Sequence, residues 1–176
     1  MSVNPEFQTR YEGRAWTFPA NIPTDALVKS RYVFDPMEEI VKHVLEDYNP
    51  RFPLEVRPGD IVVAGHHFGQ SSGRAIATKA LKATGIGCVV SSAFSRTFYR
   101  NCFEIGLPSL EVPEVTEFVE DGDHLVIDLV DGLFRNETRN IERSVPPAPP
   151  FLLRMLAAGG LIALTQSDPD WAQRTD

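Results

Sequence analysis

The feature that most constrains the fold is an apolar run followed directly by a turn of mostly small residues and then by a helix-forming run. Residues 60–65 have the length and the β-branching of a buried strand. Residues 75–83 are rich in good helix formers and end before Thr84-Gly85. This order predicts a strand, a turn over residues 66–74 and a helix. Free backbone N–H groups and the positive end of a helix dipole would then meet at the turn, where an anion is the natural ligand.

The turn carries two serines and an arginine, and these side chains suggest what the anion is. Arg74 can bind a carboxylate or a phosphate through two parallel hydrogen bonds. Ser71 and Ser72 add hydroxyl groups at the start of the helix. The alternative interpretation is that one of the two serines only caps the helix. On position alone, both interpretations stay open.

Composition and charge narrow the class of protein. The chain has 176 residues, of which 43% are hydrophobic and 23% charged, as in a soluble globular domain. A net charge of −7 argues against nucleic acid as a partner. We find no apolar run long enough for a membrane span and no secretory signal, so we expect a cytoplasmic protein with no membrane partner. Cys88 and Cys102 favour a reducing compartment, and two cysteines cannot hold an iron–sulfur cluster alone.

The first part of the chain is predicted to begin with a flexible extension over residues 1–11. Residues 13–18 alternate apolar and polar side chains and are predicted to form a strand. Residues 19–25 contain two prolines and form a loop, in which Asp25 is most simply a turn or cap residue. We expect residues 26–28 to be extended.

The most regular helical pattern covers residues 35–48. Asp35 can cap this helix and Pro36 suits its first position. Pro53 and Pro58 are expected to keep the following segment extended. Apolar side chains repeat at intervals of three and four residues, which is the spacing of one buried helix face: Met37, Ile40, Val41, Val44, Leu45 and Tyr48.

Strands and helices alternate in the middle of the chain, and this alternation predicts an α/β domain with parallel strand pairing. From residue 115 the pattern changes to alternating strands joined by a hairpin at Asp131-Gly132. We predict one domain over residues 12–166 and a frayed tail over residues 167–176. The expected elements are strands at 87–91, 108–112 and 124–129 and helices at 94–105 and 151–158.

Several separated motifs, taken together, resemble one known family. The matching segments are Gly13-Arg14-Ala15-Trp16, Thr24-Asp25, residues 59–65, Phe68-Gly69, Ser72 with Arg74, residues 94–101, Gly106-Leu107-Pro108 and residues 157–162. The pattern is similar to the small subunit of the 3-isopropylmalate dehydratase and homoaconitase group, which corresponds to the swivelling domain of aconitase. The resemblance extends over about residues 12–165 and implies that fold, a compact barrel-like mixed sheet with parallel βαβ units.

The resemblance also implies an active site shared with a partner. In this family a large subunit carries a 4Fe–4S cluster whose iron acts as a Lewis acid on the substrate. This chain itself would bind no metal or cofactor. Ser72, ionised as an alkoxide, would remove a proton from a small hydroxylated or unsaturated dicarboxylate. Arg74 would hold a carboxylate of that substrate and Asp25 would orient neighbouring groups. The reaction would be one of leucine biosynthesis.

The serine turn and Phe34 depart from the family pattern, and these departures affect which substrate we expect. We predict that Arg74, Ser71, Gly73 and Phe34 all contact it. Gly73 stands where a second serine is usual, which removes a hydrogen bond worth about 1–3 kcal/mol if it is buried. Ser71 stands where glycine is usual, and a rearranged turn would let it take over part of that role. Phe34 lies near the usual place of an arginine, which favours an alkyl group over a third carboxylate.

Two classes of function fit these residues. The first is a subunit of a hydro-lyase or isomerase that is active only with its large subunit, acting on an alkyl-substituted dicarboxylate. The second is a non-catalytic or regulatory subunit that keeps the fold and has lost the reaction. The presence of Ser72, Arg74 and Asp25 favours the enzyme. A stand-alone ligand-binding domain is a third alternative.

Overall fold

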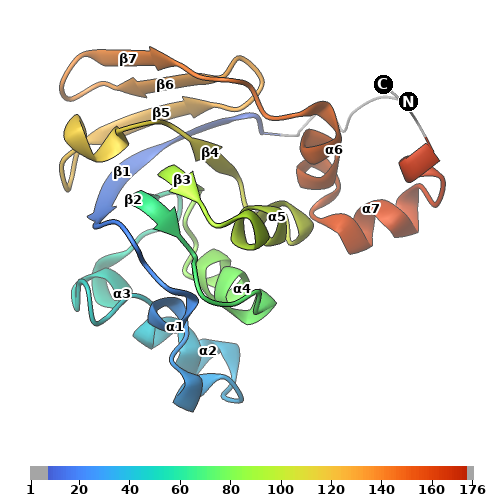
Figure 1. Ribbon diagram of the computed structural model, residues 1–176, viewed down its shortest axis with the longest axis horizontal. Coiled ribbons are helices and arrows are strands. Elements are labelled where there is room, and N and C mark those ends of the chain that lie inside the picture. Colours follow the sequence, from blue (N-terminus) through green and yellow to red (C-terminus); the bar gives the residue numbers. More distant parts are fainter. Residues whose placement is uncertain (1–7, 174–176) are drawn as a thin grey trace.

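The protein, seen here in a computed structural model that describes residues 8–173, contains a seven-stranded mixed sheet (Figure 1). The strands lie in the order β4-β3-β2-β1-β5-β6-β7. Their bounds are β1 Arg10–Phe18, β2 Ile61–Phe68, β3 Cys88–Phe94, β4 Ser109–Glu111, β5 His124–Asp128, β6 Leu133–Asn136 and β7 Ile141–Ser144. The predicted α/β class and the curled, barrel-like mixed sheet are confirmed.

The helices are short. They are α1 Thr24–Leu27, α2 Met37–Ile40, α3 Phe52–Glu55, α4 Ala75–Ala83, α5 Arg96–Glu104, α6 Pro150–Ala158 and α7 Leu161–Ser167, with 3-10 turns at Ser30–Tyr32, Val41–His43, Val115–Glu117 and Trp171–Gln173. Figure 1 shows α1 to α4 gathered on one side of the parallel strands and α6 and α7 beyond α5. Among the described helices, none is long and apolar enough by itself to cross a membrane. Taken together, α6 and α7 have the length and composition of a membrane span, but the chain bends by 85° at the break between them.

Strand β1 divides the sheet into two halves. It pairs in parallel with β2 on one side, and β2, β3 and β4 continue as parallel neighbours, as predicted. On its other side β1 pairs antiparallel with β5, and β5, β6 and β7 form successive hairpins. Because side chains alternate across a strand, β2 serves two cores: Val62 and Ala64 face one, and Ile61 and Val63 face the other.

The predicted helix over residues 35–48 is wrong in its second half. Regular helix stops at Ile40, and a 3-10 turn ends at His43. Leu45 has φ 56°, which lies in the left-handed region, and its backbone N–H donates to the carbonyl oxygen of Ala26 at 3.0 Å. Leu45 is fully buried, so a tertiary contact bends the chain where the apolar spacing favoured a helix. Asp35 does not cap the helix, because the N-cap is Pro36.

Other boundaries also differ from the predictions. Residues 26–28 were expected to be extended, but Ala26 and Leu27 belong to α1. Pro53 lies inside α3, where a proline in the first turn loses no helical hydrogen bond. Strand β1 begins at Arg10, inside the predicted extension, and Phe94 ends β3 where a helix start was predicted. The helix α7 was not predicted. Residues 1–7 and 174–176, in the predicted extension and tail, lie outside the described residues.

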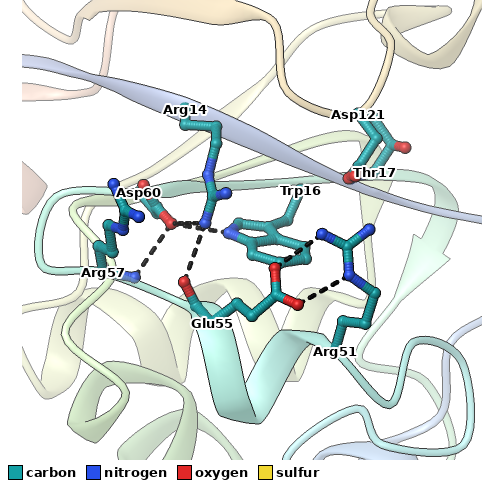
Figure 2. A network of polar contacts seen from close by, with 8 residues as sticks. All are labelled: Arg14, Trp16, Thr17, Arg51, Glu55, Arg57, Asp60 and Asp121. Atoms are coloured by element: carbon teal, nitrogen blue, oxygen red, sulfur yellow. Dashed lines mark hydrogen bonds and ion pairs between the residues drawn. The ribbon is translucent and has the colours of Figure 1, made fainter.

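A buried carboxylate joins β1, β2 and the segment after α3 (Figure 2). One oxygen of Asp60, Oδ2, accepts hydrogen bonds from Arg14 Nη2 at 2.9 Å, from Trp16 Nε1 at 2.7 Å and from the Arg57 backbone N–H at 3.0 Å. Arg14 also donates to the carbonyl oxygen of Glu55 at 3.0 Å, and its Cζ lies 4.4 Å from the centroid of the Trp16 ring. Two of the motifs behind the family resemblance thus hold the strands together.

Candidate active site

Two loops that are far apart in the sequence lie against each other beside α4. The first joins β1 to α1 and the second joins β2 to α4. Backbone hydrogen bonds connect them: Asn21 N–H to His66 O at 2.7 Å, Gly69 N–H to Ile22 O at 2.8 Å and Thr24 N–H to Gln70 O at 2.9 Å. The turn predicted as an anion site is therefore held by both loops; each loop was predicted separately, but the sequence did not show that they lie together.

The path of the second loop depends on an irregular end of β2. The pairing register of β2 with β3 shifts between His66 and Phe68, and His67 has φ 60°. Gly69 has φ 75°, and a Cβ atom on it would lie 2.1 Å from Cγ of Phe98. A side chain larger than hydrogen is therefore excluded at Gly69 by both its dihedral angle and the ring beside it. The bulge and this glycine direct the chain away from the sheet into the serine turn.

Ser72 lies between two polar partners. Its Oγ is 2.7 Å from Oγ1 of Thr24, and Arg74 Nε donates to the same Oγ at 3.1 Å. Thr24 is 1% exposed, whereas Ser72 is only partly buried. The Ser72 hydroxyl thus has one partner that can donate or accept and one that can only donate.

Arg74 pairs with Asp25, which joins the two loops again. Arg74 Nη2 donates to Asp25 Oδ1, and Asp25 lies in the first turn of α1. Asp25 is therefore neither a cap nor a simple turn residue, since the N-cap of α1 is Pro23. Of the predicted site residues, the structure brings Ser72, Arg74 and Asp25 together.

The capping interpretation of the serines is wrong for this structure. The N-cap of α4 is Arg74, and no side chain forms a capping hydrogen bond there. In the first turn of α4, the Ala77 N–H donates to the Arg74 carbonyl oxygen at 3.1 Å. The N–H groups of Ala75 and Ile76 have no acceptor within a helix that starts at Ala75, so the anion site predicted from the strand–turn–helix pattern stays a prediction that rests on these two groups.

The remaining predicted residues are placed differently. Ser71 is exposed, has φ 80°, and its Oγ lies 3.5 Å from Thr24 Oγ1. Gly73 is exposed, and its carbonyl oxygen accepts from Asn101 Nδ2 at 3.1 Å. Phe34 stands apart from this cluster. Its side chain is 97% exposed and belongs to neither apolar core of the described residues, so a structural role in the core is excluded.

Sequence reasoning missed the part played by Thr24 and Asn101. In the sequence, Thr24 stands out only as the neighbour of Asp25 and Asn101 only as part of a motif, and neither position indicates a role in the site. Their contacts with Ser72 and Gly73 span 48 and 28 positions of the chain. No local pattern predicts such a contact; the available signal was that each polar residue lies within a motif that carries the resemblance.

The described residues offer no fitting ligand set for a metal or cluster. Residues 8–173 contain no group of three or more His, Cys, Asp or Glu side chains that could hold a metal ion. Cys88 and Cys102 are both fully buried, and burial raises the pKa of both thiols, that of Cys102 to about 12. Because metals bind the thiolate, such cysteines are poor ligands. No step of the chemistry is therefore assigned to a metal held by this chain.

Ser72 does not line either of two cavities described for residues 8–173. A cavity of about 550 Å³ lies between Tyr11, Gly87 and the end of α6, and one of about 360 Å³ lies beside Phe18 and Glu120. The serine turn instead lies on an open surface, with Ser71 and Gly73 exposed on either side of Ser72.

Comparisons with known proteins agree with this fold and show the family. The model of the aconitase C-terminal domain matches residues 30–115. The 3-isopropylmalate dehydratase small subunit of Thermodesulfovibrio yellowstonii is 42% identical over 159 residues, covering 89% of this chain and 94% of that protein. The one from Nautilia profundicola is 46% identical over 152 residues, covering 85% and 90%. The crystal structure of 3-isopropylmalate dehydratase from Methanocaldococcus jannaschii superposes with a TM-score of 0.85 at 30% identity, covering 93% of this chain and 98% of that one. The chain therefore belongs to the family of 3-isopropylmalate dehydratase small subunits, which are hydro-lyase subunits of the aconitase type.

Proposed function

We propose that this subunit supplies the base and a carboxylate-binding arginine to the active site of a dehydratase of the 3-isopropylmalate type. Ser72 is the base and Arg74 binds the substrate. The observation that carries the proposal is the position of Ser72 Oγ, which lies 3.1 Å from Arg74 Nε and 2.7 Å from Thr24 Oγ1 just before the uncapped start of α4.

The surroundings of Ser72 favour an ionised hydroxyl. A serine alkoxide is costly in water, so a site that uses one needs a cation and hydrogen-bond donors aimed at the oxygen. Arg74 supplies both charge and a donor through Nε. The positive end of α4 adds a favourable potential, since no side chain caps its first N–H groups. These features support Ser72 in the role of proton acceptor from the carbon next to the substrate's hydroxyl-bearing carbon.

Arg74 is suited to hold a carboxylate while it supports Ser72. Its Nε contacts Ser72 and its Nη2 contacts Asp25, so the guanidinium plane is fixed by two partners. Among the contacts described for residues 8–173, Nη1 has no partner, and it is the group left to meet a substrate oxygen. Asp25 orients the arginine, which is the role expected of it from the family resemblance.

The open position of Ser72 supports a site completed by a second subunit. A base on an exposed turn would be surrounded by water, and catalysis by an alkoxide requires that water be excluded. We propose that a large subunit covers this surface and carries a 4Fe–4S cluster, which supplies Lewis-acid chemistry at the substrate. This chain supplies the proton acceptor and the carboxylate contact.

Reconstitution tests the proposal. The chain purified alone should be inactive on alkyl-substituted malates, and anaerobic mixing with a cluster-bearing large subunit should produce dehydratase activity. Activity of an iron-free preparation of this chain alone would contradict the proposal. A complex that assembles and binds the substrate without turnover would instead support the alternative, a regulatory subunit that has lost the reaction.

Phe34 is expected to influence which substrate is preferred. Because its ring is 97% exposed, Phe34→Arg should not disturb the fold. If the assembled site places Phe34 against the variable group of the substrate, the arginine should raise the preference for a carboxyalkyl malate over an alkyl malate by about tenfold, through a charge-assisted hydrogen bond. The measurement is the ratio of kcat/KM for the two substrates.

A matched control separates this effect from a general change of surface charge. Leu54 in α3 is 81% exposed, so Leu54→Arg adds the same charge at another exposed apolar position. The control should leave the ratio unchanged. An equal shift in both variants, or none in Phe34→Arg, would remove Phe34 from the substrate site.

A further inference from the structure

Thr24 is fixed on the inner side of the serine turn by its backbone and its side chain. Its N–H donates to the carbonyl oxygen of Gln70 at 2.9 Å. Its Oγ1 lies 2.7 Å from Ser72 Oγ and 3.5 Å from Ser71 Oγ. Thr24 is 1% exposed, so it contacts the turn from the protein interior while the substrate side stays open.

We propose that Thr24 is a positioning residue for Ser72, holding its Oγ in one orientation in both protonation states. This inference rests on the proposed function of Ser72 as the base. Arg74 Nε can only donate a hydrogen bond, so it cannot accept one from the hydroxyl of a neutral serine. Thr24 Oγ1 is the acceptor within reach of that proton.

When Ser72 is ionised, its oxygen can only accept hydrogen bonds. The Thr24 hydroxyl then turns about its C–O bond and donates, so that Thr24 and Arg74 both stabilise the alkoxide. Thr24 keeps its own proton throughout. A hydroxyl group suits this double role because it can donate and accept, and a charge-assisted bond of this kind is stronger than a neutral one.

The side chain of threonine adds rigidity to this contact. A β-branched residue has few accessible χ1 rotamers, and the burial of Thr24 restricts them further. A serine on an exposed turn would otherwise sample three staggered rotamers, and the 2.7 Å contact with Thr24 Oγ1 selects one of them. Fixing Oγ therefore favours the reactive geometry without contact between Thr24 and the substrate.

The test compares two Thr24 variants and one control variant, all measured in the complex reconstituted with the large subunit. Thr24→Val keeps the size and branching of the side chain and removes the hydroxyl. We expect it to lower kcat about 10- to 100-fold while KM changes by less than about twofold, because the lost bond strengthens in the transition state. Thr24→Ser restores the hydroxyl and should recover most of kcat, which a purely structural role of the methyl group would not predict.

Thr78 provides the matched control. It is a fully buried threonine in α4, and its Oγ1 donates to the Ala75 carbonyl oxygen at 2.9 Å, away from the serine. Thr78→Val should leave kcat unchanged. An equal loss of kcat in Thr78→Val and Thr24→Val would overturn the inference, because it would show a general sensitivity of the buried hydroxyls.

The outcomes also separate this inference from the proposed function. If Ser72→Ala is inactive and Thr24→Val keeps full kcat, Ser72 is the base and Thr24 does not position it. If Ser72→Ala turns over normally, the proposed function fails and the inference fails with it. Should Thr24→Val not assemble, Thr24→Ala is measured in its place against Thr24→Ser, and an equal kcat for those two contradicts the inference.

Discussion

Ser72→Ala should abolish turnover in the reconstituted enzyme while assembly and substrate affinity stay nearly intact. Removing a general base costs about 10²- to 10⁴-fold in rate. The serine contributes to the transition state more than to substrate binding, so the loss should be in kcat and not in KM. Arg74 and Asp25 remain paired in the variant, so the carboxylate contact is retained. Steady-state kinetics and a direct measurement of substrate binding together provide the check.

Ser71→Ala is the control for the position of the base. Ser71 Oγ is exposed and lies 3.5 Å from Thr24 Oγ1, against 2.7 Å for Ser72 Oγ. Its loss should therefore lower kcat much less than the loss of Ser72. Inactive Ser71→Ala together with active Ser72→Ala would move the base by one residue. Normal turnover in both variants would leave the turn as an anion-binding loop without a catalytic serine.

Asp60→Ala should destabilise the fold by about 2–4 kcal/mol, the largest stability effect that we expect from a single polar substitution here. Asp60 Oδ2 accepts three hydrogen bonds, from Arg14, Trp16 and the backbone of Arg57. The variant leaves the buried Trp16 N–H without its acceptor and removes the carboxylate that pairs with Arg14, whose guanidinium then keeps only the Glu55 carbonyl oxygen as a hydrogen-bond acceptor. The free energy of unfolding, from urea titration of the isolated chain, is the quantity to compare.

Asp121→Ala is the matched control for that substitution. Asp121 also lies beside β1, and its Oδ1 accepts one bond, from the Thr17 backbone N–H at 3.1 Å (Figure 2). It is exposed, so water replaces the lost acceptor and the expected change is within about 1 kcal/mol. Equal losses in the two variants would contradict the view that burial and the threefold contact of Asp60 make it important.

The strand–turn–helix unit could be predicted because its signals are local. The β-branched run 61–63 and the helix formers of residues 75–83 each favour their own conformation, and β2 and α4 form at these residues. Residues 35–48 show the limit of the same method. Their apolar spacing is helical, but the contact of Leu45 with Ala26 overrides it, and that contact has no trace in the local pattern.

Individual candidate residues of the site could be named from the sequence, but their arrangement could not be predicted. Ser72 and Arg74 were recognised from the turn and from the family resemblance, and the pairing of Arg74 with Asp25 links two candidates that were named separately. The contact between Thr24 and Ser72 joins loops 48 positions apart, so only the folded chain reveals it. Asp60 was noticed as part of a motif, and its burial beneath Arg14 explains why that motif is structural.

The way the two loops are joined has a consequence for how freely this site can change its sequence. Asn21 and Thr24 contact the opposite loop through backbone atoms, which every residue type other than proline can provide, whereas Gly69 makes the same kind of contact but must remain glycine. Substitutions at the exposed Ser71 leave these backbone contacts in place, whereas a Cβ atom on Gly73 would lie 2.8 Å from Cγ2 of Thr97 and would force one of the two to move. We therefore expect substitutions at Gly73 to shift the turn that carries Ser72, and a saturation library at this position would show how large a side chain the turn accepts.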